Sequence, residues 1–480
     1  MPARTPSPHV SRATNAGDHM RTPVQPDRAW PHAVPLFPPL AEETCACLSH
    51  LPEALHAVRP LNAAHRRCLP EDVAALSRLL TTERAGLCKP YWGNPAAMSA
   101  YLYYFLPWNL VRLARLLAAL PLPDPRSLRD GQALLLDMGS GPLTLPLALW
   151  LAKPEWRTAP VHVLAVDTSP QPLHIGNALM TTLGSLIGLP TWKVSTVRAP
   201  LEQATHKALH LLAKGHMHPW LVSAVNVLNE VRESRRRRGT TLTTLEDDDA
   251  NTVTEERDIQ GMMDTRLGNL LASLAPLWAA AADKPEKSWP ALLFVEPGTR
   301  LGGSTIMRLR RLALDGGLMA LAPCTHQKTC PLERSRTWCH FTFDSMGAPA
   351  WLTELSDQAG LGKSGLSLAP LLLTAATEAE FGDGRLQARI VSSPFVVPDL
   401  RGRARYACSR HGLLLLEQAE GLHSGDLVPV DSPLSKERDR KSGAHIVRQM
   451  NRIKHTPHSV PLMLKQLSGS TLHYTKGRSQ

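Results

Sequence analysis

The stretch QALLLDMGSGPLTLPLALWLA, residues 132–152, decides the fold. It begins with an apolar run of strand length, turns at DMGSG, and continues with apolar residues over the length of a helix. The same unit recurs in VHVLAVDTSPQPLHIGNALM (161–180), HPWLVSAVNVLNEV (218–231) and PALLFVEPGTRLGGSTIMRLRRLAL (290–314). Alternating strands and helices predict an α/β domain, in which helices cover both faces of a parallel sheet.

The turn in this stretch has the pattern D-x-G-x-G, with Asp137, Gly139, Ser140 and Gly141 directly after the strand. Its glycines allow backbone amides to approach a ligand closely, and the following helix directs its positive end toward the same place. The third glycine of a dinucleotide fingerprint is missing. The pattern instead resembles motif one of class I S-adenosylmethionine-dependent methyltransferases, which have a Rossmann-like sheet. The alternative is an α/β fold that keeps the turn and binds nothing.

This resemblance implies S-adenosylmethionine binding by further residues. An acid at the end of the second strand binds the ribose in that family, and Asp167 occupies this position. Asn229 and Glu230, in VLNEV, follow the fourth strand, where enzymes that methylate exocyclic amines often carry a Pro-Pro motif. The lookalike SSPF at 392–395 lies far downstream and is interpreted as chance. Cofactor binding is therefore expected, whereas no catalytic motif supports turnover.

Composition constrains the partner and the compartment. No apolar run approaches the roughly 20 residues of a membrane span, and the N-terminal residues lack the apolar segment of a secretory signal. A reducing compartment is expected, which disfavours disulfides. The formal charge of +11 favours a polyanionic partner such as RNA. A basic surface is expected from RLRRL (Arg308, Arg310, Arg311), RGRAR (Arg401, Arg403, Arg405) and KERDRK (436–441).

Shifts in composition divide the chain into five parts. The aromatic residues around YLYYF, at 101–105, are expected to pack the second part against the third. The parts are a disordered extension (1–35), a helical region (36–125), a methyltransferase-like domain (126–320) with a flexible insertion (233–258), a cysteine and β-rich region (321–432), and a basic tail (433–480).

Three of the eight cysteines, Cys324, Cys330 and Cys339, lie close together, and Cys408 follows in the β-rich region. Four thiolates would suit zinc or an iron–sulfur cluster if the β-rich region folds back. The spacing lacks the C-x2-C pairs of a zinc ribbon. His326 and His340 keep a Cys3His zinc site open, and four unrelated buried thiols are the remaining alternative.

The strings DMGSGP, VNVLNEV, FVEPGTR, APCTH, TCPL, TWCHF and RDRKSGA occur in this order between about residues 90 and 450. Together they resemble the methyltransferase-like small-ribosomal-subunit family, which has mitochondrial and bacterial members. The resemblance implies association with the small ribosomal subunit and its RNA. It also implies a 4Fe-4S cluster on Cys324, Cys330, Cys339 and Cys408, with both histidines left as neighbouring packing residues.

The expected function is that of an S-adenosylmethionine-binding iron–sulfur protein that acts on the small ribosomal subunit, as an assembly factor or an RNA methyltransferase. One alternative is a non-catalytic RNA-binding assembly factor with a vestigial cofactor pocket. The other is a zinc-stapled methyltransferase of a non-ribosomal substrate. Neither a membrane nor DNA is expected as a partner. The expected location is the bacterial cytoplasm, with the mitochondrial matrix as the alternative.

Overall fold

The computed structural model describes most of the chain between Trp30 and Arg448. No helix in this part is long and apolar enough to cross a membrane. The described residues are 30, 32–81, 91–128, 131–214, 216–228, 249–282, 289–333, 335, 337–375, 386–431 and 433–448.

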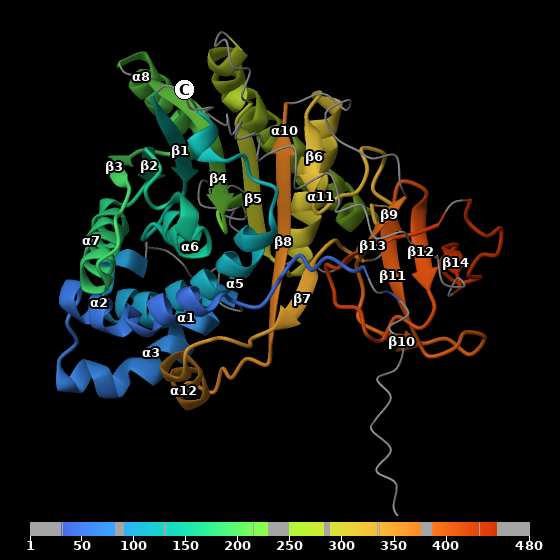
Figure 1. The fold of residues 1–480 in the computed structure, drawn as a ribbon, viewed down its shortest axis with the longest axis horizontal. Helices are drawn as coiled ribbons and strands as arrows, with labels where there is room; N and C mark the ends of the chain where they lie inside the picture. The colour runs from blue at the N-terminus through green and yellow to red at the C-terminus, as the bar shows by residue number, and fades with distance from the viewer. Residues whose placement is uncertain are drawn as a thin grey trace, which may run out of the picture.

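A central, mostly parallel sheet confirms the α/β prediction (Figure 1). Its order is β3-β2-β1-β4-β5-β8-β6, and β7 also pairs with β8. The parallel strands are β1 (Gln132–Met138), β2 (Val161–Asp167), β3 (Lys193–Arg198), β4 (Met217–Val225) and β5 (Ala291–Pro297). The antiparallel pairs are made by β8 (Gly365–Thr374) with β5, β6 (Met319–Ala322) and β7 (Phe341–Asp344). Strands from the cysteine and β-rich region thus complete the central sheet.

Successive residues of a strand point to opposite sides of the sheet, and both sides of these strands are apolar. Each face of the sheet therefore carries an apolar core. In β1, Leu135 joins one core, and its neighbours Leu134 and Leu136 join the other. The first core includes residues of α6 (Thr144–Ala152) and α7 (Pro170–Ile187). The second includes residues of α8 (Ala204–Lys214), α10 (Asp249–Ala282) and α11 (Arg300–Asp315).

Helix α10 changes the interpretation of the expected flexible insertion. It begins at Asp249, so residues 249–258 are helical. The preceding residues of the insertion, 233–248, lie outside the described part of the chain. The apolar residues of α10 that the sequence did not single out, Leu267, Leu270, Leu274 and Leu277, pack into the second core.

The N-terminal region is helical and lies against the first face of the sheet (Figure 1). Helix α5 packs on α6, and α2 packs on α7. A π-helical turn, Tyr101–Phe105, separates α4 from α5 and belongs to this packing. The helices are α1 (Glu42–Ser49), α2 (Leu51–Val58), α3 (Ala63–Thr81), α4 (Pro95–Ala100) and α5 (Leu106–Ala119).

A second sheet follows β8 and has its own apolar core. Its order is β13-β9-β11-β12-β14, and β10 pairs with β11. The last strand lies within the region expected to be a basic tail. The strands are β9 (Gln387–Ile390), β10 (Phe395–Val396), β11 (Arg403–Ser409), β12 (Gly412–Leu416), β13 (Leu427–Pro429) and β14 (His445–Val447). Helix α12 (Ala350–Gln358) precedes β8.

The segment 32–41 connects the two sheets with the helical region. Val34 and Leu427 of β13 exchange backbone hydrogen bonds of 2.9 and 2.8 Å. The ring of Phe37 stacks on Phe343 of β7 with centroids 4.1 Å apart. Arg115 of α5 is buried and donates to the carbonyl oxygen of Phe37 and to the carboxylate of Asp344. The expected boundary after residue 35 therefore falls inside an ordered connection.

Candidate functional site

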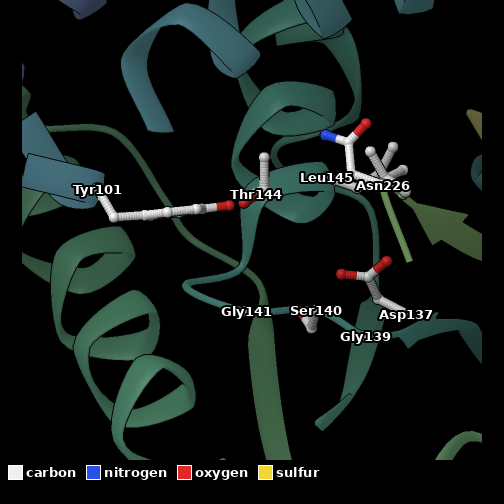
Figure 2. Close-up of a pocket in the computed structure, with 9 residues that line it drawn as sticks. Tyr101, Asp137, Gly139, Ser140, Gly141, Thr144, Leu145 and Asn226 are labelled. Atoms are coloured by element: carbon white, nitrogen blue, oxygen red, sulfur yellow. The ribbon is translucent and has the colours of Figure 1, made fainter. Parts of the chain in front are cut away.

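The first candidate site is a pocket at the carboxyl ends of β1 and β4. The strand order reverses between these two strands, which is where open α/β sheets bind ligands. Figure 2 shows side chains from the turn after β1, from the end of β4 and from the helical region around one space. The lining residues are Tyr101, Asp137, Gly139, Ser140, Gly141, Thr144, Leu145, Val225 and Asn226.

The backbone of the turn requires glycine at both positions of the G-x-G pattern. Gly139 and Gly141 have φ angles of 70° and 53°, in the left-handed region that side chains disfavour. A Cβ atom on Gly139 would also lie 2.6 Å from Cγ2 of Val227. The turn can therefore bring the chain after β1 against the segment that follows β4.

Asp167 stabilises this turn from the end of β2. Its Oδ2 accepts a hydrogen bond from the amide of Gly141, and its Oδ1 accepts one from the amide of Ser169, each at 2.9 Å. Burial raises the pKa of the Asp167 carboxyl group, although these backbone amides favour its charged form. The observed role of Asp167 is therefore to position the glycine turn.

Asp137 is the buried acid of the pocket, with only 2% of its surface exposed. The hydroxyl of Ser223 donates to its Oδ1 at 2.6 Å. Its Oδ2 finds no hydrogen-bond partner in the described part of the chain. Burial raises the pKa of this carboxyl group to about 6, although the neighbouring hydroxyl groups of Ser140 and Ser223 lower it.

Two more acceptor atoms at the pocket share this condition. Oγ of Ser140 and Oδ1 of Asn226 are buried and, among the residues described, have no hydrogen-bond partner. Asn226 has a φ angle of 58°, which is uncommon for a residue other than glycine and is often found at functional positions. Buried polar groups without partners are costly in a folded protein, so their gathering at one pocket indicates a polar ligand.

The residue after β4 differs from the expectation. Asn229 and Glu230 lie outside the described residues, and the side chain that lines the pocket is Asn226. The buried carboxylate of Glu296, at the end of β5, accepts a hydrogen bond from the amide of Leu228 at 2.8 Å and so fixes this segment. Asn226 directly follows the buried strand β4, much as Asp167 ends the buried strand β2. The reasoning used for Asp167 could therefore have identified Asn226 from the sequence.

Tyr101 adds a wall from the helical region. It lies at the start of the π-helical turn, and such turns are frequent at functional sites. Its ring packs against Trp92 and Phe105, as expected of these aromatic residues. It also extends across the pocket toward Thr144 (Figure 2). This second role depends on tertiary packing and left no signal in the sequence.

The second candidate site gathers all four predicted cysteines around one pocket. Cys324, Cys330 and Cys339 lie in the loop between β6 and β7, and Cys408 lies on β11. All four are free thiols. The second sheet therefore does fold back onto the cysteine loop.

Charged and aromatic groups surround these thiols. Burial raises the pKa of Cys330, Cys339 and Cys408, and the neighbouring thiols raise it further. Nε2 of His326 lies 3.4 Å from Sγ of Cys408, and burial lowers the pKa of this histidine to about 4, so it is neutral. The ring of His340 stacks on Trp338 and is not among the residues that line the pocket.

The described residues contain no group of three His, Cys, Asp or Glu side chains that is placed to hold one metal ion. The expectation of a metal-linked C-terminal region is thus not supported by a preformed ion site. What the structure does provide is a pocket that four thiols line together.

The basic surface expected from the arginine patches is only partly present. Arg310 and Arg405 are buried and donate to backbone carbonyl groups, so they are wrong as RNA contacts. Arg308 and Arg311 form ion pairs with Asp264 of α10. The exposed arginines of these two patches are Arg401 and Arg403. A cluster of charged residues in the sequence does not show which of its side chains the fold buries.

Comparison with known proteins gives one family match. The model of the family described as "Mitochondrial small ribosomal subunit Rsm22" matches residues 269–346, which include the end of α10, β5, α11 and three of the four cysteines. No curated protein matches the chain.

Solved structures match the chain at low similarity. A putative class I S-adenosylmethionine-dependent methyltransferase from Listeria monocytogenes has 9% identity and a TM-score of 0.29, and the match covers 70% of this chain and 88% of that chain. A putative sarcosine dimethylglycine methyltransferase from Galdieria sulphuraria has 11% identity and a TM-score of 0.23, with 58% and 88% covered. A DrdV–DNA complex has 10% identity and a TM-score of 0.24, with 70% and 41% covered.

The family match falls on the segment that carries the strings FVEPGTR, APCTH, TCPL and TWCHF, and this segment contributes β5, β6 and β7 to the central sheet. This segment of the chain is therefore similar to the family described as "Mitochondrial small ribosomal subunit Rsm22".

Proposed function

We propose that the chain binds S-adenosylmethionine in the pocket between β1 and β4 and acts on the small ribosomal subunit. The observation that carries the proposal is the set of three buried acceptor atoms without described partners, on Asp137, Ser140 and Asn226. S-adenosylmethionine presents an ammonium group, a sulfonium centre and ribose hydroxyls, which suit a pocket of acceptors that includes a carboxylate.

The residues of the pocket fit this ligand in distinct ways. Asp137 supplies negative charge in a buried place, where its interaction with a cation is stronger than in water. Gly141 leaves room beside its backbone for close approach, and Tyr101 lines one side. Asp167 holds the turn in place and is proposed to retain its predicted contact with the ribose. When bound, the cofactor would supply an activated methyl group.

The proposed partner is ribosomal RNA of the small subunit. The family that matches is described by its association with that subunit in mitochondria, and the net charge of +11 suits a polyanion. The exposed basic residues of the predicted patches, which could contact phosphate groups, are Arg401, Arg403, Lys436, Arg438, Arg440 and Lys441. Methylation of this RNA is the reaction that the cofactor would serve, and the mitochondrial description favours an organelle as the compartment.

The four thiols are proposed to hold a 4Fe-4S cluster. They line one pocket, and thiolates are the usual ligands of such clusters. Around one zinc ion, with Zn–S bonds of about 2.3 Å, the sulfur atoms would lie within roughly 4 Å of one another. Among the described residues, no three His, Cys, Asp or Glu side chains are grouped in this way. The cluster would link the cysteine loop of the central sheet to β11 of the second sheet.

Substitutions at the first pocket test the cofactor proposal. Asp137→Asn removes the charge and keeps the shape, and Asn226→Gly removes the amide while allowing the left-handed backbone. Each should weaken S-adenosylmethionine binding about tenfold or more in equilibrium titration, since each removes a buried polar contact. Gln418→Gly is the matched control, because Gln418 is also left-handed with a buried amide oxygen but lies outside the pocket. Unchanged affinity in both pocket variants would contradict the proposal.

Binding should also depend on pH through Asp137. A cationic ligand favours the ionised carboxylate, so affinity should fall as the pH drops through about 6, by up to tenfold per unit below it.

The stability of the ligand-free chain should change with pH in the opposite direction. The raised pKa stabilises the fold at low pH, and this contribution is lost as the pH rises from about 4 to about 6. Asp137→Asn should abolish both dependences, and a wild-type affinity that stays flat across this range would exclude Asp137 as the cation's partner.

Metal analysis tests the cysteine site on protein purified without oxygen. About four irons and four sulfides per chain are expected, with absorbance near roughly 400 nm, and both should be lost in Cys330→Ser and Cys408→Ser. Cys68→Ser is the matched control because this thiol is exposed and distant from the pocket. One zinc without sulfide would reject the cluster and restore the zinc-stapled alternative.

A transfer assay separates the catalytic from the non-catalytic form of the proposal. Purified small subunits incubated with the protein and methyl-labelled S-adenosylmethionine should acquire label in their RNA if the chain is an RNA methyltransferase. Binding of both ligands without label would identify the non-catalytic assembly factor instead.

A further inference from the structure

Arg310 of α11 is a buried cation that lacks the usual partner. Its exposed fraction is 4%, and within the described residues no carboxylate forms an ion pair with it. Its neighbours Arg308 and Arg311, on the same helix, both pair with Asp264. A buried guanidinium without a paired carboxylate is costly unless acceptors around it compensate for the water that it has lost. Arg310 therefore requires negative charge from its own surroundings.

The contacts of Arg310 all belong to the cysteine loop. Its Nε donates to Sγ of Cys324 at 3.0 Å. Its Nη2 donates to the carbonyl oxygens of His326 and Lys328 at 2.8 and 2.9 Å. One planar side chain thus fixes the first cysteine and also the backbone that leads to Cys330. A lysine has the charge but lacks the rigid fork that makes these bonds together.

Arg389 of β9 offers a comparison within the same site. It is also buried and lines the same pocket, but its hydrogen bonds go to the carbonyl oxygens of Pro323 and Gly425. Arg389 therefore joins the backbone directly before Cys324 to the backbone of the second sheet. Arg310 is the arginine that donates to a thiol sulfur. The two side chains place two positive charges beside a pocket whose four thiols would become negative on binding metal.

We infer that Arg310 is a positioning residue of the cysteine site, which holds Cys324 for cluster binding and sets the reduction potential of the bound cluster through its N–H···S hydrogen bond. This inference rests on the proposed iron–sulfur site. It goes beyond that proposal because Arg310 is not one of the four cysteine ligands. Donors to ligand sulfur atoms withdraw electron density and stabilise the reduced cluster, so they raise its potential. They also oppose loss of the ligand by holding it in place.

The test uses the full chain, purified without oxygen, in four forms: wild type, Arg310→Met, Arg310→Lys and Arg308→Met. Arg308→Met is the matched control, because it removes a charge from the same helix without touching a cysteine. Three readouts are measured: iron and sulfide per chain, the midpoint potential of the cluster by spectroscopic redox titration, and the rate at which its absorbance decays in air.

Arg310→Met should shift the midpoint potential to more negative values and accelerate the loss of absorbance several-fold. Arg310→Lys should give an intermediate result, since it keeps the charge and loses the fork, and Arg308→Met should match the wild type. A folded Arg310→Met that fails to load iron, beside a fully loaded Arg308→Met, also supports the inference. If Arg310→Met does not fold, Arg310→Lys decides on the same readouts.

Wild-type potential and decay in a loaded Arg310→Met would overturn the inference and leave the iron–sulfur proposal intact. Equal shifts in Arg310→Met and Arg308→Met would overturn it as well, because they would show a general effect of charge on the helix. A wild-type chain that binds no iron would overturn the iron–sulfur proposal itself and this inference with it.

Discussion

Backbone pairing along β8 is the constraint on which both candidate sites depend. One edge of this strand binds β5 in antiparallel register from Leu292 to Pro297, and the other edge binds β6 and β7. Because β6 and β7 both pair with the same edge of β8, the loop between them begins and ends beside β8. That loop carries three cysteines. Pro370 and Leu371 of β8 line the cysteine pocket directly. The strand then leads the chain into the second sheet, which returns Cys408 to the same place.

The two sites are built on neighbouring elements. Glu296, at the end of β5, holds the segment after β4 that lines the first pocket. Directly after it, the carbonyl oxygen of Gly298 accepts a hydrogen bond from the ring of Trp338, next to Cys339. Helix α11 then carries Arg310 to Cys324. The segment FVEPGTRLGG therefore stabilises both pockets, and it lies inside the stretch that the family model matches.

Much of the framework could be predicted from sequence, because it depends on local patterns. Apolar runs of strand length predict β1, β2, β4 and β5, and the spacing of glycines after β1 predicts the turn that Gly139 and Gly141 form. From the sequence, Cys408 is expected near the other cysteines only if the β-rich region folds back. Tyr101 comes from a separate helical region, and its place at the pocket depends on how that region packs. From the sequence alone, Arg310 is expected at the surface with Arg308 and Arg311, because all three are arginines of one basic cluster. Only the burial of Arg310 in the structure distinguishes it from the other two.

The central claim is that the acceptor atoms between β1 and β4 form a cofactor site, and a crystal structure with S-adenosylhomocysteine tests it most directly. This product of methyl transfer keeps the ammonium, carboxylate and ribose groups. The account predicts ligand density in this pocket, with polar atoms of the ligand within hydrogen-bonding distance of Asp137 Oδ2 and Asn226 Oδ1. A pocket that stays empty at saturating ligand, or density that lies elsewhere on the chain, would contradict it.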